Sequence, residues 1–205
     1  MEAKYLLQLY EMGDRNFTSM DLSGADLSKA NLIGVNLRGI NLTGANLCRA
    51  FLMRANLCDA FLNWSDMSFV KLSDANLSNA DLTKANLKGA FLVKSDLSKA
   101  RLSGAVLDGV NLRGAVLTGA NLCGANLADV NLRGADLRGA NLSWANLSGA
   151  RLSGALLDGA FMNGVNLSGA FMNGVDLARA NLSGVNLSAA KLSGANLQSA
   201  NLQAC

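Results

Sequence analysis

Residues that carry out nucleophilic or metal chemistry are scarce in this chain, and their spacing keeps them apart. The 205 residues include no histidine, so neither a Ser–His nor a Cys–His nucleophile can be built. The four cysteines are Cys48, Cys58, Cys123 and Cys205. The repeat described below puts the first three on three different sides of the molecule. We therefore expect free thiols typical of a cytoplasmic protein, with no disulfide and no metal site.

Carboxylates are dispersed in the same way. Almost every Asp occupies a position that the repeat directs outward, and no two of them form a concave, desolvated pair of the kind that acid–base catalysis uses. The formal net charge of +3 is too small to indicate a class of partner for the chain as a whole. The sequence thus predicts a protein that is not an enzyme, with no catalytic residues and no cofactor.

These positions follow from a five-residue period. From Phe17 to Leu202 every fifth residue is large and apolar, which makes 38 positions. We call this residue the centre of its pentapeptide. The centres are all Leu except Phe17, Met67, Met162 and Met172. The residue two before the centre is mainly Ala, the residue directly before it is mainly Asn or Asp, and 20 of the 21 glycines lie two after it.

A period of five fits neither a helix nor a flat strand. Five helical steps turn a side chain by about 140°, and an odd period in a strand sends alternate Leu residues into water. A corner in each pentapeptide lets every Leu point to one axis, which indicates a β-solenoid. Gly then supplies the positive φ of a type II turn. Eight successive corners from Arg49 to Lys84 lack Gly, and there we expect a different class of turn.

The pattern resembles the pentapeptide repeat family, whose consensus is A(D/N)LXX. The segment 145–149 (Ala-Asn-Leu-Ser-Gly) matches this consensus directly. The resemblance implies an all-β fold, a right-handed quadrilateral parallel β-helix with four pentapeptides per coil. At about 4.8 Å per coil, the repeat would form a rod roughly 45 Å long. The uninterrupted repeat is similar to that of cyanobacterial members, most of which have no known biochemical role.

Residues 2–12 do not carry the repeat. They show the apolar stripe of an amphipathic helix, formed by Ala3, Leu6, Leu7 and Tyr10. We expect residues 1–14 to form a short N-terminal capping helix over the open first coil, and residues 15–205 to form a single β-helical domain. The chain shows neither a signal peptide nor an apolar run that could span a membrane, so we expect a cytoplasmic location.

One side of the expected rod is basic. Every fourth pentapeptide shares a side, and the side that starts at Leu32 has seven basic residues and one acidic residue, Asp74, for a net charge of +6. The basic residues are Arg54, Lys71, Lys94, Arg113, Arg133, Arg151 and Lys191, and Phe51, Phe91 and Phe171 lie among them. This stripe is a candidate surface for an acidic protein, a polyanion or a membrane surface. A solvated face that keeps rods apart is the competing interpretation.

A second candidate surface is aromatic. Phe61, Trp64 and Trp144 lie together on another side, with Trp64 only three residues after Phe61. Exposed aromatic side chains favour a partner site. Packing of these rings between the corners of neighbouring coils explains them equally well.

The pattern as a whole predicts a non-catalytic structural or protein-interaction scaffold whose partner is another protein. Some family members look like duplex DNA in shape and negative charge, bind DNA gyrase and protect against quinolones. This chain departs from them because its surface is not acidic, no loop interrupts the repeat and no dimerisation helix follows it. Two alternatives remain open, a gyrase- or topoisomerase-binding DNA mimic and a nucleic acid or other polyanion binder that uses the basic stripe.

The C-terminal coil has no visible cap after Leu202. The unpaired backbone N–H and C=O groups at an exposed coil edge can pair with another chain. A two-fold stack of two such ends would cover both edges. We therefore expect a homodimer through the C-terminal coil, with Cys205 near its symmetry mate. A monomer whose last coil frays is the alternative.

Overall fold

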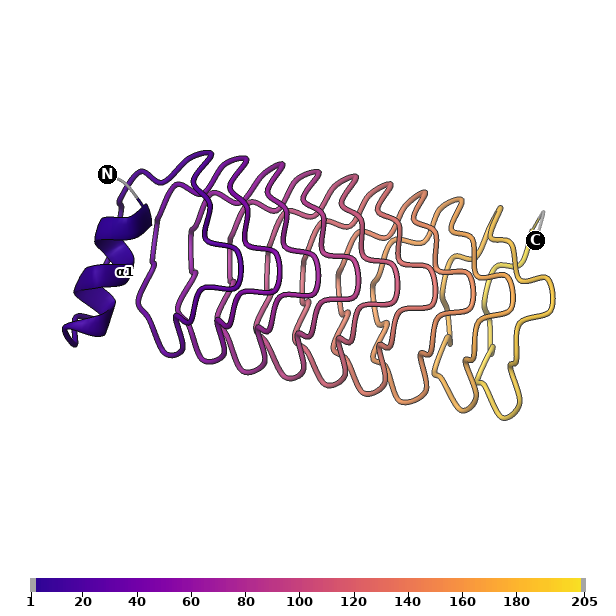
Figure 1. The fold of residues 1–205 in the computed structure, drawn as a ribbon. Helices are drawn as coiled ribbons and strands as arrows, with labels where there is room; N and C mark the ends of the chain where they lie inside the picture. The colour runs from indigo at the N-terminus through magenta and orange to yellow at the C-terminus, as the bar shows by residue number, and fades with distance from the viewer. Residues whose placement is uncertain (1–2, 204–205) are drawn as a thin grey trace.

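The computed structural model describes residues 3–203 as a rod of stacked coils with one helix at its N-terminal end (Figure 1). Helix α1 (Ala3–Glu11) turns its apolar stripe onto the first coil, and Leu6 is completely buried there. The Tyr10 hydroxyl also donates a hydrogen bond of 2.9 Å to the carbonyl of Ile33. The helix thus covers an apolar end that would otherwise meet water, and the expected capping helix is confirmed.

Each coil contains four pentapeptides. Along most of the rod, the residue before the centre forms a parallel bridge with the residue 20 positions later, as Asn131 does with Arg151. The amide of most centres donates to the next coil, with Leu132 N–H to Arg151 O at 2.8 Å as an example. Between residues 3 and 203 these bridges are isolated, and no longer strand forms. The expected four-sided parallel β-helix is confirmed. We number its sides 1 to 4 after their first centres, Phe17, Leu22, Leu27 and Leu32, so that side 4 is the basic side.

The interior is a continuous column of centres and of the small residues two before them. Leu132 and Ala135 are fully buried, as are nearly all their equivalents. Two of these small residues are polar, Ser65 and Ser95. Their hydroxyls donate to the carbonyls of Leu62 and Leu92, at 2.6 and 2.8 Å, which satisfies them inside an apolar column. The column therefore accepts a polar group only where the neighbouring turn supplies a partner.

The corners that the structure describes share a positive φ at the residue two after the centre. Glycines two after the centre have φ between 63° and 72°, and the non-glycine residues at this position have φ between 54° and 61°. The corners from Arg49 to Lys84 belong to this second group, so the expected different class of turn was wrong. Along most of the rod, hydrogen bonds between coils hold the corners at positive φ, and they outweigh the strain of roughly 1–2 kcal/mol that a side chain adds there.

Asparagines outside the column stabilise the corners and connect the coils. The Asn141 side-chain oxygen accepts the amide of Ser143 at 3.1 Å, an arrangement repeated along the rod. On side 3 the Asn146 amide group also donates to Asn126 at 2.9 Å and accepts from Asn166 at 3.1 Å. Side 3 therefore carries an amide ladder as well as turn hydrogen bonds.

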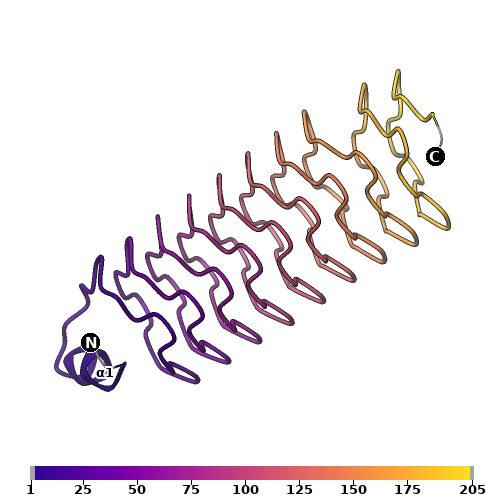
Figure 2. The same ribbon diagram turned by 90° about the horizontal axis from the view of Figure 1, so that it is seen from above.

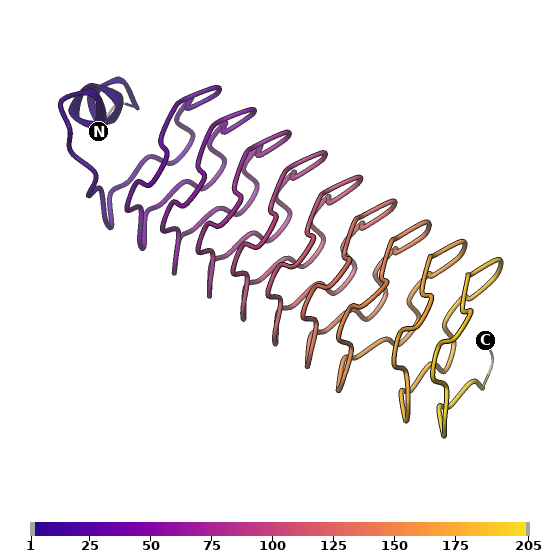
Figure 3. The same cartoon turned by 90° about the horizontal axis from the view of Figure 1, so that it is seen from below.

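Within residues 3–203 the stack opens at one place. On sides 1 and 2, residues 157–163 face residues 176–181 of the next coil without the bridges that pair other neighbouring coils. Figures 2 and 3 show this wider gap where the colour changes from orange to yellow. On side 3 the same two coils remain paired, since Leu167 N–H donates to Asn186 O at 2.8 Å. On side 4, Met172 N–H donates to Lys191 O at 2.8 Å. We call the open part the seam.

Candidate interaction surfaces

The basic side runs along the rod as a line of exposed cations. All seven predicted basic residues lie on side 4, and six are exposed, while Lys71 is half-buried. Phe51, Phe91 and Phe171 are 41%, 40% and 43% exposed among them. Side 4 therefore presents both charge and apolar area to a partner.

Rings and cations alternate in two separate rows on side 4. Lys71 forms parallel bridges with both Phe51 and Phe91, which fixes the three side chains in a row. The Lys71 ammonium lies 3.3 Å from the centroid of the Phe91 ring, a cation–π contact. Arg151, Phe171 and Lys191 are bridged in the inverse order, cation–ring–cation, farther along. The central residues of the two rows, Lys71 and Phe171, lie five coils apart, or about 24 Å at 4.8 Å per coil.

The cations of side 4 are not neutralised. Three salt bridges occur within residues 3–203, and all lie on sides 1 and 2: Arg38–Asp59 at 3.2 Å, Arg101–Asp81 at 3.0 Å and Arg138–Asp136 at 2.6 Å. The hydrogen bond from Arg138 holds the pKa of Asp136 below its ordinary value. None of the seven cations of side 4 has such a partner in the described chain, so their charge remains available to another molecule.

The predicted aromatic patch is not brought together as one surface. Phe61 and Trp64 are neighbours at 48% and 60% exposed, but Trp144 lies four coils away on the same side 2 at 71% exposed. The Trp144 ring packs over Gly164 of the next coil, where a Cβ atom would collide with it. The Phe69 ring packs over Gly89 in the same way. Packing of rings over glycine corners therefore explains at least Trp144.

Three cysteines lie on different sides of the rod: Cys48 on side 3, Cys58 on side 1 and Cys123 on side 2. All three are half-buried. Each of these three is a free thiol. Within the described chain, no three Cys, Asp or Glu side chains are grouped to hold a metal ion. Cys205, which was predicted to approach a symmetry mate, lies outside the described residues.

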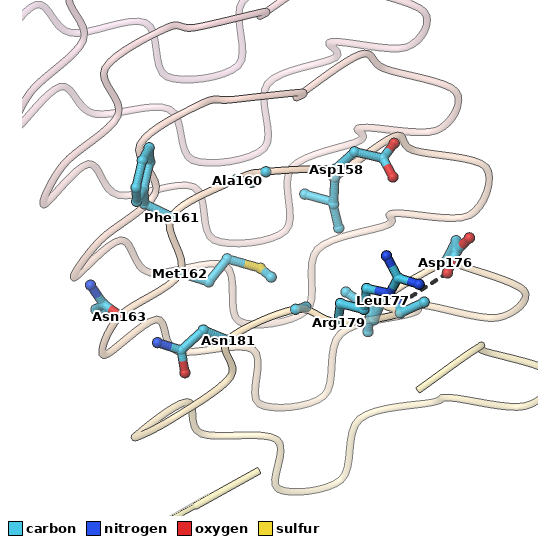
Figure 4. Close-up of a pocket in the computed structure, with 13 residues that line it drawn as sticks. Asp158, Ala160, Phe161, Met162, Asn163, Asp176, Leu177, Arg179 and Asn181 are labelled. Carbon is cyan, nitrogen blue, oxygen red and sulfur yellow. Dashed lines mark hydrogen bonds between the residues drawn. The ribbon is translucent and has the colours of Figure 1, made fainter. Parts of the chain in front are cut away.

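The seam encloses a cavity that the sequence reasoning missed. Its volume is about 380 Å³, and Figure 4 shows it between two successive coils. One wall is Leu157 to Asn163, and the other is Asp176 to Asn181. The available signal was in the coil that forms the first wall. Met162 and Met172 replace Leu on opposite sides of this coil, so its interior holds two long unbranched side chains where other coils hold at most one.

The C-terminal end of the column is less covered than the N-terminal end. Leu192 and Leu197 are half-buried and Leu202 is 45% exposed, whereas Leu6 of α1 seals the other end. This exposure agrees with a sticky coil edge, but the homodimer itself stays a prediction. No helix within residues 3–203 is long and apolar enough to cross a membrane.

Comparison with known structures identifies similar rods. HetL from the cyanobacterium Nostoc sp. strain PCC 7120, a pentapeptide repeat protein involved in heterocyst differentiation regulation, is 34% identical. The match covers 100% of this chain and 94% of HetL, with a TM-score of 0.57. A trypsin-treated variant of QnrB1, a plasmid-mediated fluoroquinolone resistance protein, is 19% identical over 89% of this chain and 91% of its own, with a TM-score of 0.68. QnrB1 thus shares the fold.

Comparison with protein-family profiles supports the structural matches. A search among curated proteins found no match. The profile described as Pentapeptide repeats matches in overlapping segments that together run from residue 16 to residue 205. With this match over the whole β-helix and the identity to HetL, the chain belongs to the pentapeptide repeat family.

Proposed function

We propose that this protein is a non-catalytic interaction scaffold whose side 4 binds the acidic surface of a partner protein. The observation that carries the proposal is the contrast between the sides. Side 4 carries seven cations against one carboxylate, Asp74, and none of these cations has an ion-pair partner among residues 3–203, whereas acidic and basic residues balance on sides 1 and 2. A rod with one uncompensated face attracts and orients an oppositely charged surface.

A protein partner fits side 4 better than a nucleic acid does. Phe51, Phe91 and Phe171 interrupt the line of cations and leave apolar area exposed. Aromatic residues and arginines are enriched at the centres of protein interfaces, and each Phe offers area that a phosphate backbone would not bury. A DNA mimic would need a negative surface, and the charge of side 4 is opposite in sign.

The relationship to HetL supports an interaction role over a catalytic one. HetL is described as involved in regulating differentiation, and the match extends over this whole chain. A regulatory rod of the same length acts through what it binds. We extend the same proposal to the setting of this protein, a cyanobacterial cytoplasm in which its partner is another protein.

The test is a charge reversal on side 4 with a matched control on side 3. Arg113→Glu combined with Arg133→Glu changes the net charge by −4 at two exposed positions without an ion pair in the described chain. Lys29→Glu combined with Lys88→Glu makes the same change on side 3. Each form is used to capture partners from lysate of the source organism, and captured proteins are purified and retested by calorimetry at two salt concentrations.

The proposal expects an acidic protein that binds the wild type and the side 3 variant equally and the side 4 variant at least about tenfold more weakly. Its affinity should also fall as salt rises. Equal binding of both variants would refute the proposal. A mobility shift of a duplex DNA that only the side 4 variant abolishes, without any protein partner, would establish the polyanion alternative. Inhibition of gyrase supercoiling by all three forms would instead favour the DNA mimic.

A further inference from the structure

We infer that the seam is a binding slot for an extended polypeptide strand supplied by a partner protein. This inference is independent of the proposed function of side 4, because the seam opens on sides 1 and 2. It starts from the backbone, which forms hydrogen bonds between coils along the rest of the rod.

The two walls of the seam carry unused backbone groups in strand register. In other coils, the amides equivalent to those of Leu157, Gly159 and Met162 donate to the following coil, but these three have no acceptor in the described chain. On the opposite wall, the amides of Asp176 and Asn181 have no acceptor among residues 3–203, although their equivalents donate to the preceding coil. Donors therefore face the cavity from both walls.

Acceptors face the cavity as well. The carbonyls of Ala155 and Ala160 receive no amide from the following coil within the described residues, and those of Asp176 and Ala178 receive none from the preceding coil. An anion would satisfy only the donors, and a cation only the acceptors. An extended polypeptide offers alternating N–H and C=O groups on both of its edges, as each coil does for its neighbours, and satisfies both walls at once.

The side chains of the seam define the sequence of the strand. Leu157, Met162 and Leu177 are buried and line its inner side, so the strand needs small and aliphatic residues that point inward. Figure 4 shows Asp158 and Asp176 with their carboxylates on the same flank of the cavity. Arg179 is the one cation among the lining residues, which leaves the lining with a net charge of −1. The strand should therefore carry a basic residue at its outward position.

A pentapeptide of this chain already has these features. Residues 190–194 read Ala-Lys-Leu-Ser-Gly, with a small residue and a Leu pointing inward and a Lys pointing outward. Two such pentapeptides would cover the two open sides. The probe is therefore the acetylated and amidated decapeptide AKLSGAKLSG. The same peptide with both Leu amides N-methylated is the matched control, because it keeps every side chain and loses two donors.

The experiment follows the backbone amides of the full ¹⁵N-labelled chain by NMR. Without peptide, the amides of Leu157 and Met162 should exchange with solvent far faster than that of Leu167, which is paired on side 3 of the same coil. Adding AKLSGAKLSG should shift and protect the seam amides and leave Leu167 unchanged. N-methylation should weaken binding by about tenfold or more, as expected for two lost hydrogen bonds.

Charge provides a second measurement. The decapeptide ADLSGADLSG should bind more weakly than the Lys form, and Asp158→Lys combined with Asp176→Lys should reverse this preference. Seam amides as protected as Leu167 in the free protein would overturn the inference, because the slot would then be closed. Equal binding of the N-methylated peptide would overturn it as well. Protection that rises with protein concentration, without peptide, would assign the slot to a second copy of this chain and overturn the assignment to a separate partner.

Discussion

Replacing Gly89 by Ala should destabilise the rod more than replacing Gly109, although both are corners of side 3. Their φ values are 64° and 63°, so the backbone strain is the same. That strain, partly offset by the stiffer unfolded chain, should cost about 1 kcal/mol at either position. At Gly109 a new Cβ meets no atom within 4 Å, but at Gly89 it would lie 2.7 Å from Cε1 of Phe69. The Phe69 ring must therefore leave the corner.

The size of the difference follows from that ring. Phe69 is 44% exposed, and its ring lies over the Gly89 corner. If the ring loses about 60 Å² of contact, the additional loss is about 1.5 kcal/mol at 25 cal/mol per Å². The weak cation–π contact from Arg49, 5.8 Å from the ring centroid, would be lost with it. We expect a total of about 2.5 kcal/mol for Gly89→Ala.

The assay is native-state hydrogen exchange, because a solenoid need not unfold in one step. The reporters are the Leu87 amide, which donates to Val106 at 2.7 Å, and the Leu107 amide, which donates to Asn126 at 2.6 Å. In a Phe69→Ala background the two glycine substitutions should become equivalent. If they differ by less than about 0.3 kcal/mol in the wild-type background, the ring does not rest on the corner and the reasoning fails.

Four further predictions concern the column, the ladder, the charges and the end of the rod. Leu132→Ala should cost ~2–5 kcal/mol in thermal unfolding because its fully buried site cannot collapse, and Leu132→Lys should abolish the fold; a Lys variant that melts like the wild type would disprove the inward assignment. Asn146→Ala should cost about 1 kcal/mol more than Asn141→Ala by calorimetry, since Asn146 also has ladder bonds to both neighbours, and equal costs would discount the ladder. The hydrogen bond from Arg138 lowers the pKa of Asp136, so the Asp136 carboxylate stabilises the fold at neutral pH. This contribution is lost as the pH falls below about 3.9, the pKa of Asp in the unfolded chain. Asp136→Asn should flatten acid unfolding curves in that range, and an unchanged slope would count against the Asp136–Arg138 pair. Leu202→Lys should convert a homodimer to a monomer in sedimentation at tens of micromolar, and a monomer in both forms would exclude stacking through the C-terminal coil.

The architecture was predictable because the sequence repeats one local solution. The phase of Leu from Phe17 to Leu202 determines which residues point inward, and the stripe from Ala3 to Tyr10 is enough to predict the cap. Counting pentapeptides by four also places the seven cations on one side, because the coil contains four sides without insertion. These features depend on spacing alone.

The features that were missed depend on interactions between coils. Arg49 takes a positive φ because backbone hydrogen bonds between coils hold its corner, whereas its residue type alone disfavours that conformation. For Trp144 the sequence left a partner site and corner packing equally open, and the position of its ring over a glycine of the next coil favours packing. The seam involves two coils whose sequences still follow the repeat, and only Met162 and Met172 distinguish the first of them. Packing volume in three dimensions, which a one-dimensional pattern omits, decides whether neighbouring coils close.

The seam also gives the rod a mechanical property. Along most of the rod, neighbouring coils are hydrogen-bonded on all four sides, which resists bending in any direction. At the seam the backbone hydrogen bonds between the two coils are on sides 3 and 4. Bending at the seam should therefore be easier about that joined edge than in any other direction. On side 4 the Phe171–Lys191 bridge joins the two coils. For a molecule docked along side 4, the spacing between the cations would stay constant even where the coils move apart on sides 1 and 2.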